Sequence, residues 1–357
     1  MRAAPVLLAS VVAFALMEGA VFHTELYPWI LNPNSSTGDL ETILRDERER
    51  PKSGAQVLGI GDSRMLLAER LANQHTPETG YTFGNIATAG ASPRAWYYML
   101  RDTDPTARLY RAIVIAVESY DDADVWSDDN DSEADLSYLI ARLRLSDLWE
   151  FSHSYDDPPL RWKAARGILF KGLVYKRDFE DLLLSPRYRI RLAKLAHRDS
   201  FAWHYQYTGL TETISGFQVN WETQTLTAPP NADPQRVSRL RNRLLEGLPP
   251  QTGVEGRYLK YWLGKTYERY RGSPTRLIFL RLPRGGFVRP GQPPHTSRSS
   301  VRELAAQPNV TLIDEHLFES LEKPELFADE LHLNATGMIP FSLMITQEVS
   351  RILGPPR

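Results

Sequence analysis

The sequence has 357 residues, of which 42% are hydrophobic, and this length suits one large domain with a buried core. The formal net charge of −2 gives no electrostatic basis for nucleic-acid binding, so no nucleic-acid partner is expected. The lack of cysteine excludes disulfides, thiolate metal sites and a cysteine nucleophile.

The chain begins with an apolar segment. After Arg2, residues 3–17 carry no charge, Glu18 interrupts the run, and apolar residues resume up to Phe22. This pattern favours an uncleaved membrane anchor, with a cleaved signal peptide and a soluble amphipathic helix as alternatives. Because a basic flank stays in the cytoplasm, we expect residues 1–22 to be an anchor or signal segment. The rest of the chain is then exported, to the periplasm or beyond the cytoplasmic membrane.

Short apolar runs alternate with helical patterns along the remainder of the chain. Residues 23–53 are polar and rich in Pro and Asn, and we predict a linker there. Beyond it, the pattern predicts an α/β sandwich with a parallel sheet and right-handed crossovers. The strands are expected at residues 56–60, 81–87, 111–117, 275–282 and 310–313, and a final amphipathic helix at 337–353.

A long insertion separates the third and fourth predicted strands. Residues 123–271 open with an acidic stretch and continue with helical, basic and aromatic segments. Residues 213–226 contain Gly and Asn breaks and predict a hairpin. An insertion after the carboxyl end of a sheet strand lies where such folds bind ligands. We therefore predict a mainly helical cap or partner-binding subdomain.

Ser63 stands between the first predicted strand and a helical pattern that begins at Arg64, in the sequence VLGIGDSRMLLAERL. At such a junction a serine hydroxyl lies near backbone N–H groups and the positive end of the helix dipole. This placement suits a nucleophile whose attack creates an oxyanion. It equally suits a helix N-cap, and the three residues GDS alone favour the cap.

Asp329 and His332 form a second candidate group just before the final helix. A spacing of three lets the carboxylate reach the imidazole and hold its tautomer, so that the other ring nitrogen can accept a serine proton. The alternative is a capping Asp beside a surface His. His316 competes for the role of base, but no carboxylate stands at the matching spacing.

These two groups, in this order, resemble the SGNH or GDSL hydrolases over residues 55–122 and 274–353. The resemblance implies a flavodoxin-like three-layer sandwich with a parallel sheet, formed by residues 54–122 and 272–357. It also implies an acyl-enzyme mechanism in which Ser63 is the nucleophile, His332 the general base and Asp329 the residue that orients it.

The family's second block is an Asn followed by a Gly whose backbone N–H enters the oxyanion hole. Here GNIATAGAS matches it, with Asn85 opening the block as a candidate oxyanion or substrate-binding residue and Gly90 as the candidate donor beside the N–H of Ser63. A turn glycine is the alternative. The family's third block, Gly-x-Asn-Asp, is altered: Glu118 replaces Gly and Tyr120 replaces Asn, so a Tyr120 hydroxyl becomes the candidate third donor.

Arg64 follows the candidate nucleophile directly. It either binds an anionic acceptor or fixes the loop through Asp62 or Glu118, and the second interpretation is favoured. Asn334 and Thr336 are candidate caps of the last helix. The sequence contains no His, Asp or Glu cluster with metal spacing and no phosphate-binding glycine pattern, so we expect neither a metal nor a cofactor.

The apolar N-terminus, GDSR, the altered third block and HLNATG together resemble one branch of the family. It comprises the membrane-anchored SGNH-like partners of bacterial polysaccharide O-acetylation, with the D-alanine transfer protein of teichoic acid modification as a looser relative. The resemblance implies an exported O-acyltransferase with a polysaccharide acceptor and a membrane-bound O-acyltransferase partner. The alternatives are a carbohydrate or lipid acetylesterase with the same triad, and a non-catalytic scaffold or glycan-binding subunit, which Glu118 and Tyr120 favour.

Overall fold

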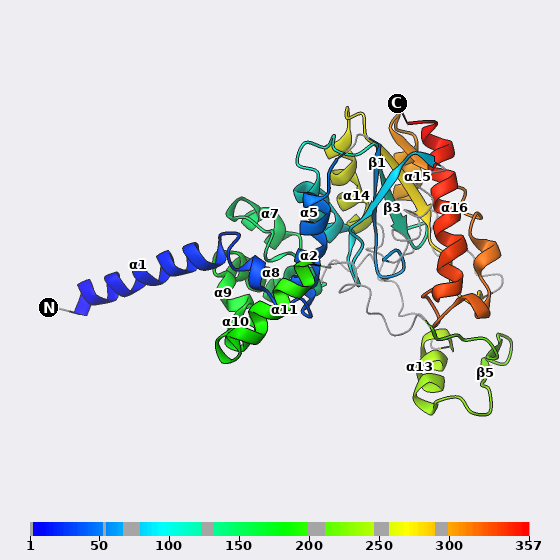
Figure 1. The fold of residues 1–357 in the computed structure, drawn as a ribbon, viewed down its shortest axis with the longest axis horizontal. Coiled ribbons are helices and arrows are strands. Elements are labelled where there is room, and N and C mark those ends of the chain that lie inside the picture. The colour runs from blue at the N-terminus through cyan, green and yellow to red at the C-terminus, as the bar shows by residue number, and fades with distance from the viewer. Residues whose placement is uncertain are drawn as a thin grey trace. The chain divides into compact units, whose positions relative to one another are not determined.

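The computed structural model describes residues 3–52, 55–66, 79–122, 132–198, 211–245, 257–289 and 299–356 (Figure 1). The chain divides into two compact units. The first comprises the described residues of Met1–Arg50, Tyr98–Thr103 and Asn130–Gln206. The second comprises those of Pro51–Tyr97, Asp104–Asp129 and Tyr207–Arg357, and it contains the main sheet.

The main sheet has five parallel strands, as predicted. Each predicted apolar run contains one strand: β1 (Gln56–Ile60), β2 (Thr82–Asn85), β3 (Ala112–Val117), β6 (Arg276–Arg281) and β7 (Val310–Leu312). Their order across the sheet is β2-β1-β3-β6-β7. In chain order this is 2-1-3-4-5, the order of a doubly wound sheet, which binds ligands beyond the carboxyl ends of its strands.

Helices flank this sheet, an arrangement compatible with a three-layer sandwich. All six residues of β3 are buried, and successive side chains point to opposite faces. Ala112, Val114 and Ala116 share a core cluster with the apolar side of the last helix. Helices α14 (Arg257–Tyr270) and α15 (Ser300–Ala305) contact β6 and β7. Burial on both faces explains why the strands read as continuous apolar runs.

The last helix, α16 (Ala335–Leu353), is confirmed where the sequence predicts it (Figure 1). Asn334 is its N-cap, and the side-chain oxygen accepts the N–H groups of Thr336 and Gly337, each at 3.0 Å. Thr336 lies inside the helix and is not the cap. Residues spaced by three or four face the core: Met338, Phe341, Ile345 and Val349.

The second unit also contains elements outside the main sheet. The predicted hairpin is confirmed as an antiparallel pair, β4 (Gln218–Asn220) and β5 (Thr225–Thr227). Helix α13 (Pro234–Leu245) follows it. Short 3-10 turns η4 (Glu319–Leu321) and η5 (Pro324–Leu326) precede α16. Helix α5 (Pro93–Thr103) contributes residues to both units.

The first unit is helical among its described residues. It contains α1 (Ala3–Phe22), η1 (Pro28–Ile30), α2 (Ser36–Glu49), α6 (Ala134–Leu139), η2 (Leu145–Asp147), α7 (Leu148–His153), α8 (Pro158–Leu169), α9 (Lys171–Val174), α10 (Lys176–Leu184) and α11 (Pro186–Arg198).

Within the described residues, α1 alone is long and apolar enough to cross a membrane, with a mean hydropathy of 2.0 over Pro5–Phe22. Large apolar side chains at Val6, Leu7 and Leu8 are exposed, and three consecutive residues point to three different sides of a helix. The helix therefore has no polar face, so the amphipathic interpretation does not describe it.

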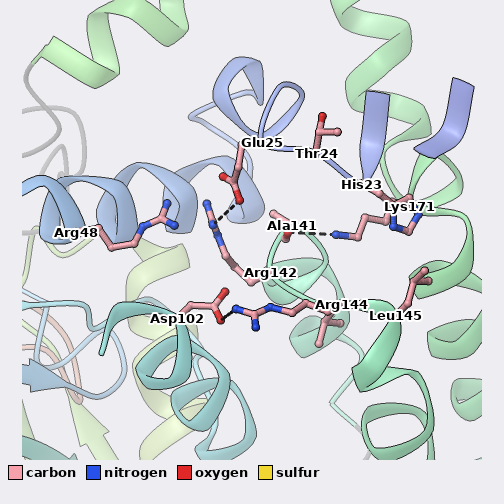
Figure 2. A pocket seen from close by; sticks show the side chains of 11 residues that line it. His23, Thr24, Glu25, Arg48, Asp102, Ala141, Arg142, Arg144, Leu145 and Lys171 are labelled. Atoms are coloured by element: carbon pink, nitrogen blue, oxygen red, sulfur yellow. Dashed lines mark hydrogen bonds and ion pairs between the residues drawn. The ribbon is translucent and has the colours of Figure 1, made fainter. Parts of the chain in front are cut away.

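The linker predicted at residues 23–53 is wrong, because much of it is folded. Ser35 caps α2, accepting the N–H of Gly38 at 3.1 Å, and Leu40 and Leu44 are fully buried. The polar sequence conceals this burial because Glu41, inside the first unit, pairs with the buried guanidinium of Arg142. Figure 2 shows Arg142 also reaching Glu25, at 3.2 Å.

The insertion predicted at residues 123–271 does not form one subdomain. Its described residues 132–198 belong to the first unit together with α1 and α2. Its described residues 211–245 and 257–271 belong to the second unit. Helix α14, at the end of the predicted insertion, packs on β6 and α15, so it is one of the helices that cover the main sheet. The acidic opening, residues 123–131, lies outside the described residues.

The packing of α16 on the sheet generates a stability prediction. The Phe341 ring is fully buried and meets Phe318 edge-on at 4.9 Å between ring centroids. We expect Phe341→Ala to lower the free energy of unfolding by about 3–5 kcal/mol, because it leaves a cavity in the core. Urea denaturation of the full chain in detergent micelles measures this.

Ile339→Ala is the matched control, because Ile339 lies on the same helix with 55% of its surface exposed. It should change the free energy of unfolding by no more than about 0.5 kcal/mol. Equal losses in the two variants would contradict the placement of the buried face of α16.

Candidate active site

Ser63 lies in a turn directly after β1. Asp62 forms the first contact of this turn, and its carboxylate accepts the backbone N–H of Arg64 at 2.8 Å. Residues 63–66 continue as turns, and the rest of the helix predicted from Arg64 to Leu71 lies outside the described residues. The Ser63 hydroxyl lies 2.7 Å from Nε2 of His332, which is 269 residues away in sequence.

His332 and Asp329 occupy a tight loop before α16. The Asp329 carboxylate lies 2.9 and 3.0 Å from Nδ1 of the His332 ring. One of its oxygens also accepts the backbone N–H groups of Leu331 and His332, at 2.9 and 2.7 Å. The loop is closed by the N–H of Ala328, which donates to the His332 carbonyl at 2.8 Å. These bonds fix both side chains relative to one another.

The charge of Asp329 sets the direction of this hydrogen-bond chain. Burial would raise the pKa of Asp329, but the hydrogen bond and charge of His332, with the two backbone N–H groups, lower it to about 2. An ionised carboxylate only accepts, so Nδ1 of His332 carries the proton. In the neutral imidazole Nε2 is then the acceptor, and the Ser63 hydroxyl donates to it. The three side chains are thus arranged for proton transfer from Ser63 to His332.

A cavity of about 330 Å³ opens onto Ser63 and His332. Gly90 lies on its wall in a left-handed conformation with φ of 69°. Glycine tolerates this conformation and lets backbone approach a ligand closely. The cavity is lined by Asp62, Ser63, Arg64, Gly90, Ala91, Trp96, Ala116, Glu118, Arg243, Leu331 and His332. The structure therefore brings Gly90 to the same cavity as Ser63.

Arg64 connects two carboxylates at the floor of the site. Its guanidinium donates to Asp62 through Nη2 at 2.6 Å and Nε at 3.0 Å, and Nη2 lies 3.3 Å from Glu118. The side chain is largely buried. This geometry is that of the loop-fixing alternative, since the bidentate contact holds the turn that carries Ser63.

Asn85 is not placed to contact a substrate, contrary to the expectation from its block. It is buried outside the cavity lining. Its side-chain nitrogen donates to the carbonyls of Met65 and Leu66 at 2.7 and 3.1 Å, and its oxygen accepts the N–H of Ala87 at 2.9 Å. Asn85 instead ties the turn after β1 to the end of β2.

Tyr120 is also not an oxyanion donor in this structure. The side chain is buried, and its hydroxyl lies 2.9 Å from the Phe279 carbonyl and 2.6 Å from the Ile313 carbonyl. Burial raises the pKa of this hydroxyl well above its ordinary value. The tyrosine side chain is longer than that of an asparagine. Its hydroxyl contacts the carbonyl of Phe279 in β6 and that of Ile313, the residue after β7.

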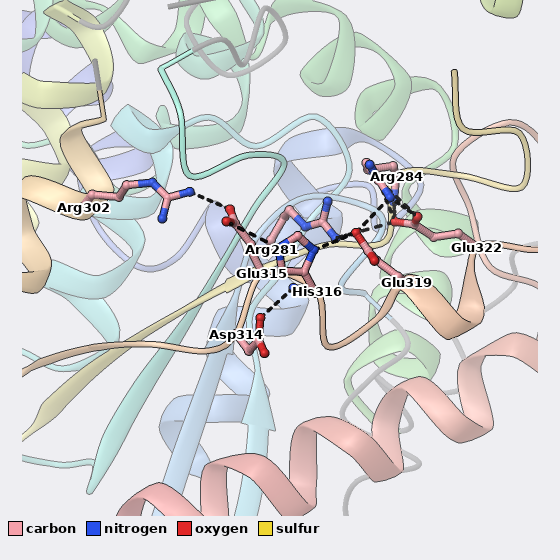
Figure 3. Close-up of polar contacts among 8 residues, drawn as sticks. All are labelled: Arg281, Arg284, Arg302, Asp314, Glu315, His316, Glu319 and Glu322. Atoms are coloured by element: carbon pink, nitrogen blue, oxygen red, sulfur yellow. Dashed lines mark hydrogen bonds and ion pairs between the residues drawn. The ribbon is translucent and has the colours of Figure 1, made fainter. Parts of the chain in front are cut away.

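His316 lies in a separate surface cluster of charged residues, shown in Figure 3. Its ring is 66% exposed, and Nδ1 lies 2.8 Å from Glu319. The hydrogen bond to Glu319 raises the pKa of His316. Glu319 and Glu322 also pair with Arg284. The imidazole thus belongs to an ion-pair network, and His332 is the histidine that reaches Ser63.

Trp96 and Arg243 have the largest side chains among the cavity residues that were not identified from the sequence. Trp96 comes from α5 and is buried. Arg243 comes from α13 and pairs with Glu330, beside the His332 loop. Neither residue belongs to a recognisable motif. Each lies on a helix, and the sequence pattern of a helix predicts which side is buried but not that a residue reaches a distant site. Within the described residues, no group of three His, Asp or Glu side chains could hold a metal ion.

No protein-family model matches the chain, and no curated protein sequence matches it.

The lowered pKa of Asp329 predicts a pH-dependent contribution to stability. The ionised carboxylate stabilises the folded state fully above its ordinary value of 3.8, and this contribution is lost as the pH falls to about 2. The gap in free energy of unfolding between wild type and Asp329→Asn should therefore narrow as the pH is lowered from about 5 to about 3. Urea denaturation at a series of pH values measures it.

Glu222→Gln serves as the control, because Glu222 is exposed in the turn between β4 and β5. The difference in free energy of unfolding between wild type and this variant is measured over the same pH range for comparison. If the difference in free energy of unfolding between wild type and Asp329→Asn stayed constant over this pH range, the described hydrogen bonds would not hold the carboxylate.

The position of Tyr120 generates a second prediction. Tyr120→Phe should lower the free energy of unfolding by about 1 kcal/mol, because the buried carbonyls of Phe279 and Ile313 lose a donor. It should leave the reaction of Ser63 with an activated ester unchanged. A loss of about a hundredfold or more in that rate would instead assign the hydroxyl to the oxyanion.

Proposed function

We propose that this protein is an exported O-acyltransferase of the SGNH type that acylates polysaccharide hydroxyl groups through an acyl-serine. The observation that carries the proposal is the chain of hydrogen bonds from Ser63 through His332 to Asp329. The strand order 2-1-3-4-5 supports a flavodoxin-like sandwich as its frame. Both the resemblance in sequence and the geometry draw on the same three residues.

The first step forms the acyl-enzyme. His332 accepts the hydroxyl proton of Ser63 at Nε2 while the serine oxygen attacks the carbonyl carbon of an ester or thioester. Backbone N–H groups of Ser63 and Gly90 stabilise the oxyanion. The tetrahedral intermediate then collapses, and the leaving group takes the proton from His332. Asp329 holds the imidazole and stabilises its transient positive charge.

The second step returns the enzyme to its starting state. A sugar hydroxyl gives its proton to His332 and attacks the acyl-serine carbonyl. Collapse of the second tetrahedral intermediate releases the new ester, and Ser63 recovers the proton from His332. Glu118 and Arg243 on the cavity wall support a carbohydrate acceptor, because carboxylate and guanidinium groups bond sugar hydroxyls.

The proposed location follows from α1. A helix of 20 residues spans about 30 Å, the thickness of the hydrocarbon core of a bilayer. We propose that α1 anchors the protein in the cytoplasmic membrane, with the second unit on the outer side. There a membrane-bound O-acyltransferase partner would supply the acyl group.

Two alternatives use the same observations differently. Water in place of a sugar hydroxyl makes the protein a carbohydrate or lipid acetylesterase. The altered third block favours a non-catalytic scaffold or glycan-binding subunit, because the Tyr120 hydroxyl lies away from the cavity. Without the Tyr120 hydroxyl, the only hydrogen-bond donors to the oxyanion that we identify among the described residues are backbone N–H groups.

The proposal predicts that the full chain in detergent micelles releases p-nitrophenol from p-nitrophenyl acetate. Ser63→Ala should lower kcat/KM by about a thousandfold or more, because no other group forms the acyl-enzyme. Ser215→Ala, an exposed serine before the hairpin, should retain the wild-type rate. Equal rates for wild type and Ser63→Ala would favour the scaffold alternative.

Transfer and hydrolysis are distinguished by adding a mixture of oligosaccharides to the same reaction. A transferase should release p-nitrophenol faster as the sugar concentration rises and should yield acetylated sugar, detected by mass spectrometry. Release that is independent of sugar, with acetate as the product, would make the protein an esterase.

A further inference from the structure

The first unit contains a cavity of about 480 Å³ that the acyl-transfer proposal does not use. It lies at the end of α1, and the three residues after that helix form part of its wall (Figure 2). The lining residues are His23, Thr24, Glu25, Arg48, Asp102, Ala141, Arg142, Leu143, Arg144, Leu145 and Lys171. All of them belong to the first unit.

Positive charge predominates on this wall. The lining contains four cationic residues, three Arg and one Lys, and two carboxylates. Arg142 pairs with Glu41 and Glu25, and Arg144 lies 3.1 Å from Asp102. The carboxylates of the wall therefore already have cationic partners.

The other two cations bond only to backbone oxygens within the described residues. Arg48 donates from Nε to the Leu44 carbonyl at 3.2 Å. Lys171 donates from Nζ to the Ala141 carbonyl at 3.2 Å, as Figure 2 shows. The part of the chain that the structure describes gives neither cation a carboxylate within ion-pair distance.

Lys171 is the more constrained of the two, since only 4% of its surface is exposed. Burial, followed by the positive charge of Arg142, lowers its pKa to about 8, although Glu41, Glu25 and Asp102 act in the opposite direction. An ammonium has three N–H donors, and one of them reaches Ala141. An anion in the cavity would accept the others and offset the cost of burying the charge.

The anchor proposal determines where this cavity lies. Glu18, near the end of α1, is buried and accepts the N–H of Gly172 at 2.9 Å, next to Lys171. The end of α1 is thus attached to the wall of the cavity. If α1 enters the bilayer, the cavity lies at the depth of the lipid headgroups.

The apolar part of the wall fits a lipid better than a free anion. Leu143 and Leu145 line the cavity, and Leu145 is exposed. Trp149, four residues further on, is also exposed. Exposed tryptophan is typical of membrane–water interfaces. We propose that this cavity binds the phosphate headgroup of an anionic phospholipid, with Arg48, Arg144 and Lys171 as its cationic ligands.

This inference rests on the proposed membrane anchor and is independent of the acyl-transfer chemistry. The test uses the full chain in micelles of an uncharged detergent and native mass spectrometry, which counts bound molecules. The probes are dihexanoyl phosphatidylglycerol, dihexanoyl phosphatidylcholine and glycerol 1-phosphate. We expect one phosphatidylglycerol to bind, and the other two probes to bind at least about tenfold more weakly.

Substitutions then localise the binding. Lys171→Met removes the buried charge and should weaken phosphatidylglycerol binding at least about tenfold. Lys176→Met, a mostly exposed lysine on α10, is the matched control and should bind as wild type does. Arg144→Gln is a second variant that does not depend on core packing, because Arg144 is mostly exposed, and it should also weaken binding.

Several results would overturn the proposal. Equal binding of the two phospholipids, no binding of any probe, or equal losses in Lys171→Met and Lys176→Met would each do so. If glycerol 1-phosphate bound as tightly as phosphatidylglycerol, the proposal that the bound phosphate belongs to a phospholipid would be wrong. Ser63→Ala should bind the lipid as wild type does, so a failure of the catalytic proposal is distinguished from a failure of this one.

Discussion

The hydrogen bonds that Asp329 accepts are the interaction on which the candidate site depends. They hold the His332 ring against the carboxylate, and the ionised state of Asp329 leaves Nε2 as the acceptor for Ser63. Against the effect of burial, the hydrogen bond and charge of His332, together with two backbone N–H groups from the same loop, lower the pKa of Asp329 and keep the carboxylate charged. Without the charge on Asp329, the tautomer of His332 is no longer fixed, and Nε2 is no longer held as the acceptor of the Ser63 hydrogen bond.

The sheet brings these residues together across the sequence. Ser63 follows β1, which lies between β2 and the central strand β3, and His332 precedes α16, whose apolar side packs on β1 and β3. Parallel strands end at one edge, so the turn after β1 and the segment after β3 meet there. Arg64 makes that meeting specific, because its guanidinium joins Asp62 of the first segment to Glu118 of the second.

Features whose cause is local in the sequence were predictable. The strands are buried on both faces and read as apolar runs, and the capped helix α16 shows its buried side through its periodicity. Features that depend on distant partners were not. Tyr120 bonds carbonyls that lie more than 150 residues further along the chain, and no local pattern reports them. The polar segment around Glu41 was expected to be a linker because the pairing of Glu41 with Arg142 is also remote.

Reaction with a fluorophosphonate tests the central claim most directly, because this reagent phosphonylates a serine that a neighbouring base activates much faster than an ordinary serine. The account predicts one label per chain, mapped by peptide mass spectrometry to Ser63 and lost in His332→Gln. Absence of labelling in the wild type, or equal labelling of Ser63 in His332→Gln, would contradict the claim that His332 activates this serine.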